Sequence, residues 1–504
     1  MKPYFTNRKQ SKNLQKKIIM KYDYDVIILG SGPAGFSCAM QSSKFDKKVL
    51  IVESNPDHLG GSWINTGTVP SKSLREASRL IQRFHTQFGD ERGRKPYEKF
   101  RMDDILQYKK SILETKNKKV KDDLIKNEVE TARGWGHLLD DHTVKISNQF
   151  GNETTYTAER ILISTGSSPD NPENFEIDHN NVLDYESILK LTHIPRRLVI
   201  VGSGIISFEY ATIFASLGTR VSVLSDNDEL LPFLDNEILG QLRQIIKKKN
   251  IQLFPECSIQ YVEANKLRTC IEVAFTSSNE KVKGRLQVLE TDHVLYVGGK
   301  KPNTENIGLD KAGVKTGKDG FIDVNENFKT SADSVYAAGD VIGFPALASA
   351  SFVQGRLAAC DMFGIPSGDV SNSIPYGIYS IPEISGIGLT EEDAANQGID
   401  YTVGRSYYKN LTQADISHID EGMLKLVFRT DNLKLLGVHI IGENAPDLIH
   451  LGQSVMYFEG DIRYFIRNIL NYPSYGEAYR IAAFNGVNRV YKAGVKYRKI
   501  LNKD

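Results

Sequence analysis

The sequence is poor in cysteine. Its 504 residues contain four, Cys38, Cys257, Cys270 and Cys360, and no two of them stand at the spacing of a dithiol or zinc-binding motif. The spacing argues against a disulfide framework, and no metal site is expected. Cys38 and Cys360 fall in segments that we expect to be helical, where a small, buried, apolar role is typical of cysteine. The pattern indicates a reduced, intracellular protein.

Long apolar runs and an excess of charge are also missing. No apolar stretch approaches the roughly 20 residues that cross a bilayer, so no membrane span is expected. The formal net charge of +1 gives no long-range field to attract nucleic acid or an acidic membrane. With 40% hydrophobic and 25% charged residues, the composition is typical of a soluble globular protein, and its length predicts two to four domains. We therefore expect a cytoplasmic protein with no nucleic-acid or membrane partner.

Acidic side chains are absent from the first 21 residues, which carry seven lysines and arginines. The longest apolar segment there is Ile18-Ile19-Met20, which is too short for a secretory signal. We expect residues 1–22 to form a disordered basic arm, because charge runs are usually solvated. An interaction tail is the alternative.

Residues 25–53 follow the order strand, glycine turn, helix, strand, acid. Gly30 permits the tight turn, Gly32 lets the backbone approach a pyrophosphate, and Gly35 lets the helix pack on the strand. The helix N-terminus stabilises the phosphates, and Glu53 can accept the hydroxyls of an adenosine ribose. The segment predicts a dinucleotide site, with a purely structural glycine turn as the alternative. The expected binding residues are Gly30, Ser31, Gly32, Pro33, Ala34, Gly35, Glu53 and Ser54.

A second glycine-rich segment follows at residues 60–72 and ends in Pro70-Ser71-Lys72. It resembles the flavin disulfide reductase family, in which two glycines and a Cys-x4-Cys redox pair precede a Pro-Ser-Lys at the isoalloxazine ring. The two cysteine positions of the family are Trp63 and Thr68 in this sequence, so its thiolate–flavin relay cannot operate here. The resemblance implies that the first site binds FAD, with Gly60, Gly61, Ser62 and Lys72 beside it.

The opening pattern repeats at residues 197–226. Glu53 stands 23 positions after Gly30, and the residue 23 positions after Gly202 is Ser225, so the second ribose-reading position lacks its carboxylate. A carboxylate there selects NAD and repels the 2′-phosphate of NADP. The Ser225 hydroxyl can bond a hydroxyl or a phosphate, and the neighbouring Asp226 keeps a bias toward NAD.

We expect this second unit to bind NAD or NADP through Gly202, Gly204, Ile205, Glu209 and Ser225. Ser207 replaces the third glycine, which loosens the packing of helix on strand. Arg220 could anchor a 2′-phosphate, but it aligns with Lys48 of the first unit. We expect both to lie at the solvated start of a strand.

Further cofactor contacts are implied by the resemblance. A strand over residues 160–163 ends in a small-residue turn with Thr165 and Gly166, and the segment around Gly299 returns the chain to the flavin domain. Another strand ends in Gly339 and Asp340, and the family uses such an aspartate for the ribityl chain. A capping aspartate is the alternative. Ala348 begins a segment of small residues, 346–363, that predicts a closely packed helix.

The last third of the chain shows apolar residues at period two from about residue 374, then helical segments at 445–458 and 477–490. This order resembles the family's C-terminal domain, which forms the homodimer. The family's His-Pro motif is Tyr472-Pro473 here. A phenol with a pKa of about 10 is a poor proton acceptor at neutral pH, and loss of the histidine fits the loss of the thiols.

The expected architecture is α/β, with two Rossmann-like dinucleotide-binding domains and an α+β C-terminal dimerisation domain. The flavin domain is expected at residues 23–170 and 300–370, the NAD(P) domain at 171–299 and the dimerisation domain at 371–495. Five stretches are most similar to the branch of the family that exchanges hydride between two nicotinamide nucleotides: 230–235, 341–350, 376–385, 441–450 and 471–480.

The resemblance implies hydride transfer from NADPH to NAD through FAD alone, in a homodimer. Lys72 and Glu209 are the expected catalytic pair, with Lys72 stabilising negative charge on the flavin. A plain salt bridge between domains is the alternative for this pair. Trp63 could stack on the flavin or pack in the core. Two other functions stay open, namely electron transfer to a quinone or other acceptor, and a catalytically impaired flavoprotein.

Overall fold

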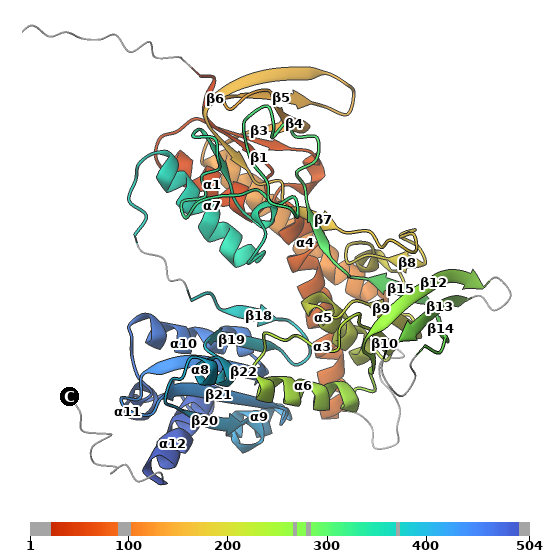
Figure 1. Cartoon of the computed structure of the whole chain (residues 1–504), viewed down its shortest axis with the longest axis vertical. Coiled ribbons are helices and arrows are strands. Elements are labelled where there is room, and N and C mark those ends of the chain that lie inside the picture. Colours follow the sequence, from red (N-terminus) through yellow and green to blue (C-terminus); the bar gives the residue numbers. More distant parts are fainter. Residues whose placement is uncertain (1–21, 89–101, 266–269, 279–283, 369–372, 493–504) are drawn as a thin grey trace, which may run out of the picture.

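The computed structural model describes residues 22–88, 102–265, 270–278, 284–368 and 373–492. Residues 1–21 of the predicted basic arm lie outside these ranges. So do residues 89–96, where the polar, charged sequence between two helical segments predicts a loop. Three large sheets and two small ones organise the chain (Figure 1). Among the described helices, none combines the length and the apolar character needed to cross a membrane.

The first sheet has seven strands in the order β3-β2-β1-β6-β5-β4, with β17 also paired to β6. Its centre is parallel, while β4, β5 and β6 pair antiparallel. The parallel strands are covered on both faces, which explains apolar runs such as the fully buried β2. Helical residues 34–39, 120–124 and 358–362 pack on one face, and β4, β5 and residues 307–341 pack on the other. The strands are β1 (Tyr24–Leu29), β2 (Val49–Glu53), β3 (Glu130–Arg133), β4 (Trp135–Leu138), β5 (Thr143–Ser147), β6 (Glu153–Ile163) and β17 (Val335–Ala337).

Two helices built from small residues pack against each other beside this sheet. α1 (Pro33–Ser43) crosses α7 (Ala348–Met362) so closely that a Cβ on Gly355 would lie 2.0 Å from the carbonyl oxygen of Ala34. The prediction of a closely packed small-residue helix at 346–363 is thereby confirmed. The packing fixes the N-terminal ends of both helices relative to the strand ends.

The second large sheet is wholly parallel, in the order β11-β10-β9-β15-β8. Its helix α5 (Ile205–Ser216) is buried along most of its length, and α6 (Asn236–Lys248) is amphipathic. A three-stranded antiparallel sheet, β12-β13-β14, stands beside it. The strands are β8 (Val182–Leu183), β9 (Arg197–Val201), β10 (Arg220–Leu224), β11 (Gln252–Phe254), β12 (Cys257–Asn265), β13 (Cys270–Ser277), β14 (Gln287–Thr291) and β15 (His293–Tyr296).

The chain leaves the first sheet and returns to it through a two-stranded antiparallel ribbon. β7 (Ser167–Pro169) leads out and β16 (Lys300–Pro302) leads back, with Lys301 opposite Ser168. The ribbon therefore carries both connections between the two dinucleotide-type units.

The third large sheet is antiparallel, in the order β18-β19-β22-β21-β20, and helices follow it in the chain, as predicted. It forms the lower part of the molecule in Figure 1. Its strands are β18 (Tyr376–Ile378), β19 (Ile384–Gly388), β20 (Tyr401–Tyr407), β21 (Gly422–Arg429) and β22 (Leu435–Gly442). Its helices are α8 (Glu391–Asn396), α9 (Thr412–Ser417), α10 (Ala445–Tyr457), α11 (Arg463–Arg467) and α12 (Glu477–Lys492). A short 3-10 turn, η5 (Tyr408–Asn410), follows β20, and η1 (Pro56–His58), η3 (Ser187–Lys190) and η4 (Asp340–Ile342) lie in other parts of the chain.

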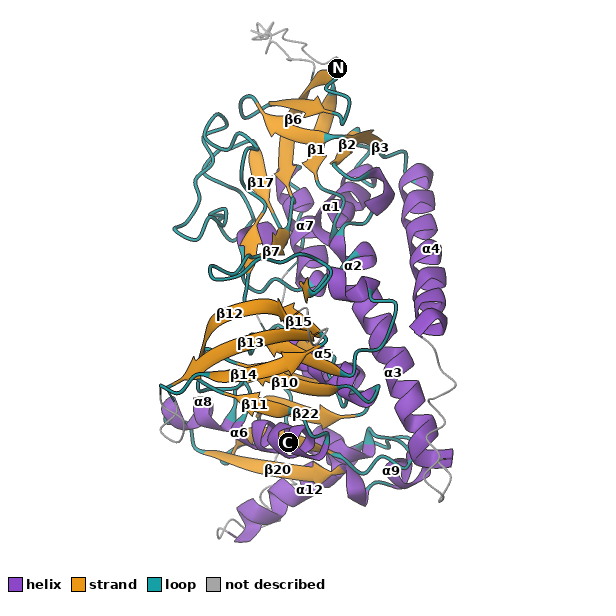
Figure 2. Cartoon of the chain, turned by 90° about the vertical axis from the view of Figure 1, so that its right-hand side faces the viewer, coloured by secondary structure: helices purple, strands orange, loops and turns teal. Residues whose placement is uncertain are grey.

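One long helix connects all three parts. α3 (Thr68–Phe88) begins after the short helix α2 (Ser62–Asn65), runs beside α4 (Met102–Lys126) and α5, and ends near α9, as Figure 2 shows. Arg75 forms a 2.7 Å salt bridge with Glu383, and Arg79 pairs with Glu443, both in the C-terminal part. Gln87 donates to the carbonyl oxygen of Ser417 at 2.8 Å. The predicted fold class is confirmed, with α3 as a common support.

A second junction is ionic and buried. The Lys425 side chain on β21 is fully buried, and its Nζ lies 2.8 Å from Asp235 and 2.6 Å from Glu391. Asp235 is also fully buried and accepts from the backbone N–H of Glu237 at 3.0 Å, so it caps α6 at the same time. This lysine therefore joins the second parallel sheet's helix to the C-terminal sheet.

Candidate active site

The first glycine turn has no room for side chains at two of its three glycines. Gly30 has a φ of +98°, and a Cβ there would lie 2.4 Å from the carbonyl oxygen of Ser164. A Cβ on Gly35 would lie 2.0 Å from the carbonyl oxygen of Gly30. At Gly32 the φ is −60° and a Cβ would meet no protein atom within 4 Å. The backbone at Gly32 therefore faces open space, as a pyrophosphate site requires.

Glu53 lies at the end of β2, next to this turn. Its Oε2 accepts from the backbone N–H of Ser31 at 3.1 Å and from the Ser31 hydroxyl at 2.5 Å. Its Oε1 accepts from the backbone N–H of Asn55 at 3.0 Å and from the Ser54 hydroxyl at 3.4 Å. The side chain is thus held in one orientation at the carboxyl edge of the parallel sheet.

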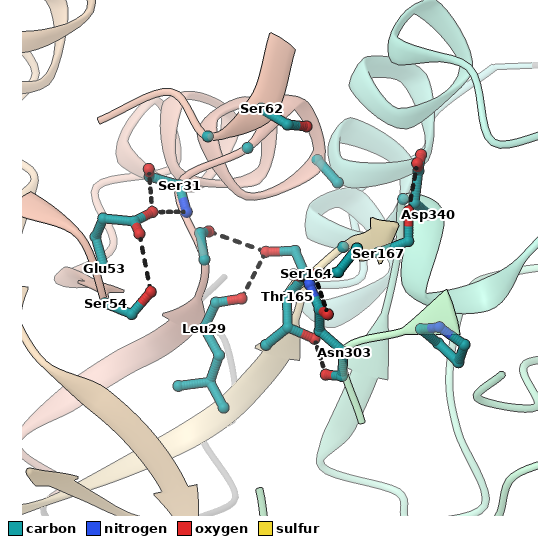
Figure 3. Close-up of a pocket in the computed structure, with 18 of the residues that line it drawn as sticks. Leu29, Ser31, Glu53, Ser54, Ser62, Ser164, Thr165, Ser167, Asn303 and Asp340 are labelled. Atoms are coloured by element: carbon teal, nitrogen blue, oxygen red, sulfur yellow. Dashed lines mark hydrogen bonds between the residues drawn. The ribbon is translucent and has the colours of Figure 1, made fainter. Parts of the chain in front are cut away.

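Asp340 lies on the opposite side of the same cavity (Figure 3). Its Oδ2 accepts from the Ser167 hydroxyl at 3.0 Å and lies 3.3 Å from Nζ of Lys300. Beside it, Asn303 cross-links the strand ends: its amide donates to the carbonyl oxygen of Thr165 at 2.9 Å, and its own carbonyl oxygen accepts from the Thr165 hydroxyl at 2.7 Å. The two carboxylates therefore mark opposite sides of one polar, elongated site.

The cavity has a volume of about 700 Å³. Most of the residues predicted for the first site line it: Gly30, Ser31, Gly32, Pro33, Ala34, Glu53, Ser54, Gly61, Ser62, Thr165, Gly166, Gly339, Asp340 and Ala348. Gly35, Gly60 and Lys72 are not among its described lining residues. Several other lining residues are not predicted by the sequence patterns: Trp135, His137, Ser167, Tyr185, Lys300 and Asn303. Trp135 and His137 come from β4, whose sequence carries no recognisable cofactor motif.

Two helix N-termini meet the cavity. Pro33 and Ala34 open α1, and Ala348 opens α7, and all three line it. Helix N-termini carry partial positive charge and free N–H groups, which favours bound phosphate. The open backbone at Gly32 and the two helix ends fit the diphosphate of a dinucleotide.

No sulfur lines this cavity among the described residues. Trp63 and Thr68 line it, whereas all four cysteines are buried and unpaired elsewhere. Burial raises the pKa of the Cys38 thiol to about 12 and that of Cys257 to about 11. Trp63 packs edge-on against Phe352, with ring centroids 5.0 Å apart. It therefore both lines the cavity and packs against a neighbouring ring, so the two roles considered for it are not exclusive.

The second glycine turn reproduces the first. Gly202 has a φ of +121°, and a Cβ there would lie 2.8 Å from the carbonyl oxygen of Val297, while Gly204 faces open space. Ile205 then begins α5. Ser207 replaces the third glycine, and its hydroxyl is buried with no hydrogen-bond partner among the described residues. The strand, turn, helix and strand predicted at residues 197–226 are confirmed by β9, α5 and β10.

Three other residues considered for the second unit lie away from the glycine turn or are bonded within their own loop. The Ser225 hydroxyl is turned toward its own loop, where it donates to the carbonyl oxygen of Asn227 at 2.7 Å. Arg220 pairs across the strands with Arg197 at the far end of β10 from the glycine turn, as its alignment with Lys48 predicted. Gly299 lies near Asp170, where the returning ribbon begins.

Lys72 and Glu209 meet between the two units. Nζ of Lys72 on α3 lies 2.6 Å from Oε2 of Glu209 on α5, and it also lies over the ring of Tyr379. Oε1 of Glu209 accepts from the backbone N–H of Tyr379 at 2.8 Å. The structure therefore brings the expected pair together and adds a third participant from the C-terminal part.

Tyr472, at the family's histidine position, is 64% exposed on the surface of the C-terminal part. Its hydroxyl lies 2.7 Å from the Thr412 hydroxyl. Ile469 beside it is 99% exposed and Phe458 on the same part is 79% exposed. Large apolar side chains in the open mark a surface suited to a protein contact.

Two dinucleotide-type units with the same turn geometry, meeting at an ion pair, are typical of a dinucleotide-dependent oxidoreductase. The chain belongs to the pyridine nucleotide-disulphide oxidoreductase family. Residues 24–355 match the family's main model, and residues 374–483 match its dimerisation domain. The predictions of the family and of an enzyme are confirmed.

The curated relatives narrow this assignment. The chain is 36% identical over 478 residues to the soluble pyridine nucleotide transhydrogenase of Pseudomonas aeruginosa (strain LESB58), with 93% of this chain and 99% of that protein covered. It is 36% identical over 476 residues to the protein of the same name from Marinomonas sp. (strain MWYL1), with the same coverage. Both alignments span all three parts of the fold.

Solved structures confirm the fold. The HOCl-induced flavoprotein disulfide reductase RclA from Escherichia coli superposes with a TM-score of 0.81 at 22% identity, covering 92% of this chain and 99% of that one. LpdA from Mycobacterium tuberculosis superposes with a TM-score of 0.82 at 22% identity, covering 91% and 98%. At this identity the likeness concerns the fold alone.

Proposed function

We propose that this protein transfers hydride from NADPH to NAD through bound FAD, without a redox disulfide. The observation that carries the proposal is the 700 Å³ cavity, which Trp63 and Thr68 line where the family resemblance expects two cysteines. Relatives named soluble pyridine nucleotide transhydrogenase, which align over 93% of the chain, support the same reaction. FAD supplies the chemistry when bound, because it can accept a hydride from one nicotinamide nucleotide and return it to another.

The residues of the chain hold and orient the nucleotides. Glu53 holds the adenosine ribose of FAD, the N-termini of α1 and α7 hold its diphosphate, and Asp340 binds its ribityl chain. At the second unit, Gly202, Gly204 and Ile205 hold the diphosphate of the nicotinamide nucleotide. The remaining assignments follow the sequence prediction for Gly35, Gly60 and Gly299.

Lys72 supplies a fixed positive charge at the flavin, and Glu209 positions its ammonium. The burial of Glu209, whose side chain is 8% exposed, and its two hydrogen-bonded oxygens support this role. A preorganised cation stabilises negative charge without solvent having to reorganise.

The proposal assigns residues 23–170 and 300–370 to the FAD domain and residues 171–299 to the NAD(P) domain. Residues 371–495 form the dimerisation domain of a homodimer, a role that the family model at 374–483 and the exposed apolar side chains there support. The enzyme acts in the cytoplasm, and the word soluble in the relatives' name supports that location.

The test is thio-NAD reduction by NADPH, followed by absorbance, compared with quinone reduction under the same conditions. We expect a yellow protein that reduces thio-NAD faster than the quinone. The protein stripped of FAD is the control and is expected to be inactive. A colourless protein that does not take up FAD would contradict the proposal. Faster reduction of the quinone would favour the alternative acceptor, and failure of NADPH to bleach the flavin would leave an impaired flavoprotein.

A further inference from the structure

The two dinucleotide-type units match each other residue by residue at the ribose end. The backbone N–H of Gly30 donates to the carbonyl oxygen of Val52 at 2.9 Å, and that of Gly202 donates to Leu224 at 2.8 Å. The next residue is Glu53 in the first unit and Ser225 in the second. Glu53 and Ser225 therefore occupy equivalent positions in the two units.

The Ser225 hydroxyl is bonded within its own loop, whereas the equivalent residue of the first unit, Glu53, lines the first cavity. The residue is 8% exposed, and its hydroxyl donates to the carbonyl oxygen of Asn227 at 2.7 Å and accepts from the backbone N–H of Asn227 at 3.0 Å. Both hydrogen bonds close the turn that follows β10. Both bonding positions of the hydroxyl are therefore used within its own loop. The next residue, Asp226, is then the side chain available to bind a ribose.

That next residue, Asp226, is exposed and has acidic neighbours. Its Oδ1 accepts from the Asn227 amide at 2.9 Å, and together with Glu256 it lines an open depression at the same edge of the sheet. Its charge also reaches Tyr296, whose pKa is raised by burial and then by Asp170, Asp226 and Glu173. Tyr296 directly precedes Val297, the residue that packs against Gly202. Asp226 lies just beyond the carboxyl end of β10, one residue after the position equivalent to Glu53.

The loop lacks a positive charge that could receive a phosphate. Residues 225–235 contain four acids and no lysine or arginine: Asp226, Asp228, Glu229 and Asp235. Arg220 starts β10, so its Cα lies roughly 16 Å along the strand from Ser225. It cannot compensate the negative charge of Asp226 at the ribose.

We propose that the second unit selects NAD(H) over NADP(H), and that the carboxylate of Asp226, rather than the hydroxyl of Ser225, makes the selection. The inference rests on the proposed function, because it assumes that this unit holds a nicotinamide nucleotide. Asp226 accepts a hydrogen bond from the 2′-hydroxyl of NAD(H) and repels the 2′-phosphate of NADP(H). Exchange of hydride still occurs, with NADP(H) as the weakly held partner.

Charge repulsion has a salt dependence that identifies it. A phosphate monoester carries about −1.5 to −2 charges at pH 7, so a carboxylate within contact distance opposes its binding. Added salt screens that repulsion. The discrimination against the 2′-phosphate should therefore narrow as ionic strength rises, whereas an arginine-built phosphate site would lose affinity.

The test measures equilibrium binding rather than turnover. ADP-ribose and 2′-phospho-ADP-ribose are titrated into the FAD-loaded protein by calorimetry at low and high ionic strength. At low ionic strength we expect ADP-ribose to bind about tenfold tighter, or more, than 2′-phospho-ADP-ribose. The ratio of the two dissociation constants should become smaller at high ionic strength. Equal affinities, or tighter binding of the 2′-phosphate, would overturn the proposal.

Variants locate the effect. Asp226→Asn removes one negative charge. We expect it to reduce the ratio of the two dissociation constants by about fivefold or more, mainly because 2′-phospho-ADP-ribose binds more tightly. Asp310→Asn makes the same charge change on an exposed turn of the flavin unit and should leave the ratio unchanged. An unchanged ratio in Asp226→Asn would remove Asp226 as the selecting residue. Lys281→Gln/Lys283→Gln, outside the described residues, should also leave the ratio unchanged, and a loss of 2′-phosphate binding there would contradict the proposal.

Failure of this inference is distinguishable from failure of the proposed function. If neither ADP-ribose compound binds and NADPH does not bleach the flavin, the nicotinamide site itself is wrong. If both bind equally and NADPH reduces the flavin well, hydride exchange stands and only the selectivity is wrong.

Discussion

The ammonium of Lys72 and the carboxylate of Glu209 lie 2.6 Å apart, although one residue belongs to the first dinucleotide-type unit and the other to the second. The second carboxylate oxygen accepts from the backbone N–H of Tyr379 in the C-terminal part. One buried carboxylate thus connects three parts of the chain. An ammonium held in this way has little freedom to move away from the site.

Replacing Lys72 by methionine should slow flavin reduction by NADPH by about 10- to 100-fold, because a fixed cation near the reacting ring is lost. The flavin midpoint potential should fall, since the reduced state carries the negative charge that the cation favours. Stopped-flow absorbance and a potential titration measure the two effects. Because the variant leaves the buried carboxylate of Glu209 without its cation, flavin content and melting temperature are measured alongside to show that it folds.

Lys248→Met is the matched control. Lys248 pairs with Glu421 at 2.8 Å and also joins the second unit to the C-terminal part, but its side chain is 64% exposed. We expect wild-type rates and potential from it. If Lys72→Met behaved like this control, the pair would be only a salt bridge between domains.

Alanine at Gly32 and at Gly204 should separate the two nucleotide sites. Neither Cβ would meet a protein atom within 4 Å, and the φ values of −60° and −77° suit alanine, so the fold should be retained. The added methyl group occupies space that the bound diphosphate needs. Gly32→Ala should weaken FAD binding, measured as flavin content, and Gly204→Ala should weaken ADP-ribose binding while FAD stays bound.

Swapped effects, or normal binding at both sites, would show that the two turns do not hold diphosphates. Gly35→Ala is the structural counterpart, because its Cβ would lie 2.0 Å from the carbonyl oxygen of Gly30. It should lower the melting temperature, whereas Gly32→Ala should leave the melting temperature of the FAD-free protein nearly unchanged.

Local patterns in the sequence predicted the two dinucleotide-type units well, because strand, turn and helix are encoded within about 30 consecutive residues. Gly30, Gly202 and the 23-residue offset to Glu53 and Ser225 all fall where the strand register places them. What the pattern could not show is the direction of a side chain in a loop. The Ser225 hydroxyl points into its own loop because the backbone carbonyl oxygen and N–H of Asn227 both bond to it.

Contacts between distant segments were beyond the reach of spacing. Only the family resemblance, and not the composition, suggested the pairing of Lys72 with Glu209, and nothing suggested Tyr379. Asn303 and Lys300 join the first site because the β7–β16 ribbon returns the chain beside β6, a contact between segments about 130 residues apart. The buried Lys425 lies 190 residues from Asp235, and no periodicity marks it.

Lys425→Met should be strongly destabilising, by about 3–5 kcal/mol, because it leaves the buried Asp235 and the neighbouring Glu391 without their cation. Urea unfolding followed by fluorescence measures the free energy of unfolding. Lys434→Met is the control, since Lys434 pairs with the largely exposed Glu459 and should change stability by less than about 1 kcal/mol. A small loss in Lys425→Met would show that the cluster does not hold charges.

The same variant has a predictable pH dependence. Burial alone would raise the pKa of Asp235, but His439, the hydrogen bond from Lys425 and the charge of Lys425 hold it below its ordinary value. A carboxylate with a lowered folded pKa stabilises the fold above its unfolded pKa of about 4, and this stability is lost as pH falls through the folded pKa. Hydrogen bonds to Asp235 and Glu391 outweigh burial and raise the pKa of Lys425, so its contribution persists past neutrality and is lost only above about pH 10.4. In the variant, burial without Lys425 favours the protonated carboxyl of Asp235, so the variant regains stability as the pH falls. The difference in the free energy of unfolding between wild type and variant should therefore begin to shrink above about pH 4 and go on shrinking below it.

Electron counting tests whether sulfur takes part. Reductive titration of the FAD-loaded protein with dithionite should consume two electrons per chain, since a flavin takes two and a dithiol couple would take two more. The four cysteines are at most 8% exposed, and burial keeps Cys38 and Cys257 protonated by raising their pKa values. Prior treatment of the folded protein with a maleimide should leave both the electron count and NADPH-dependent bleaching unchanged, because thiolates are the reactive form. Uptake of four electrons, or loss of bleaching after the maleimide, would place a thiol in the reaction and overturn hydride transfer by flavin alone.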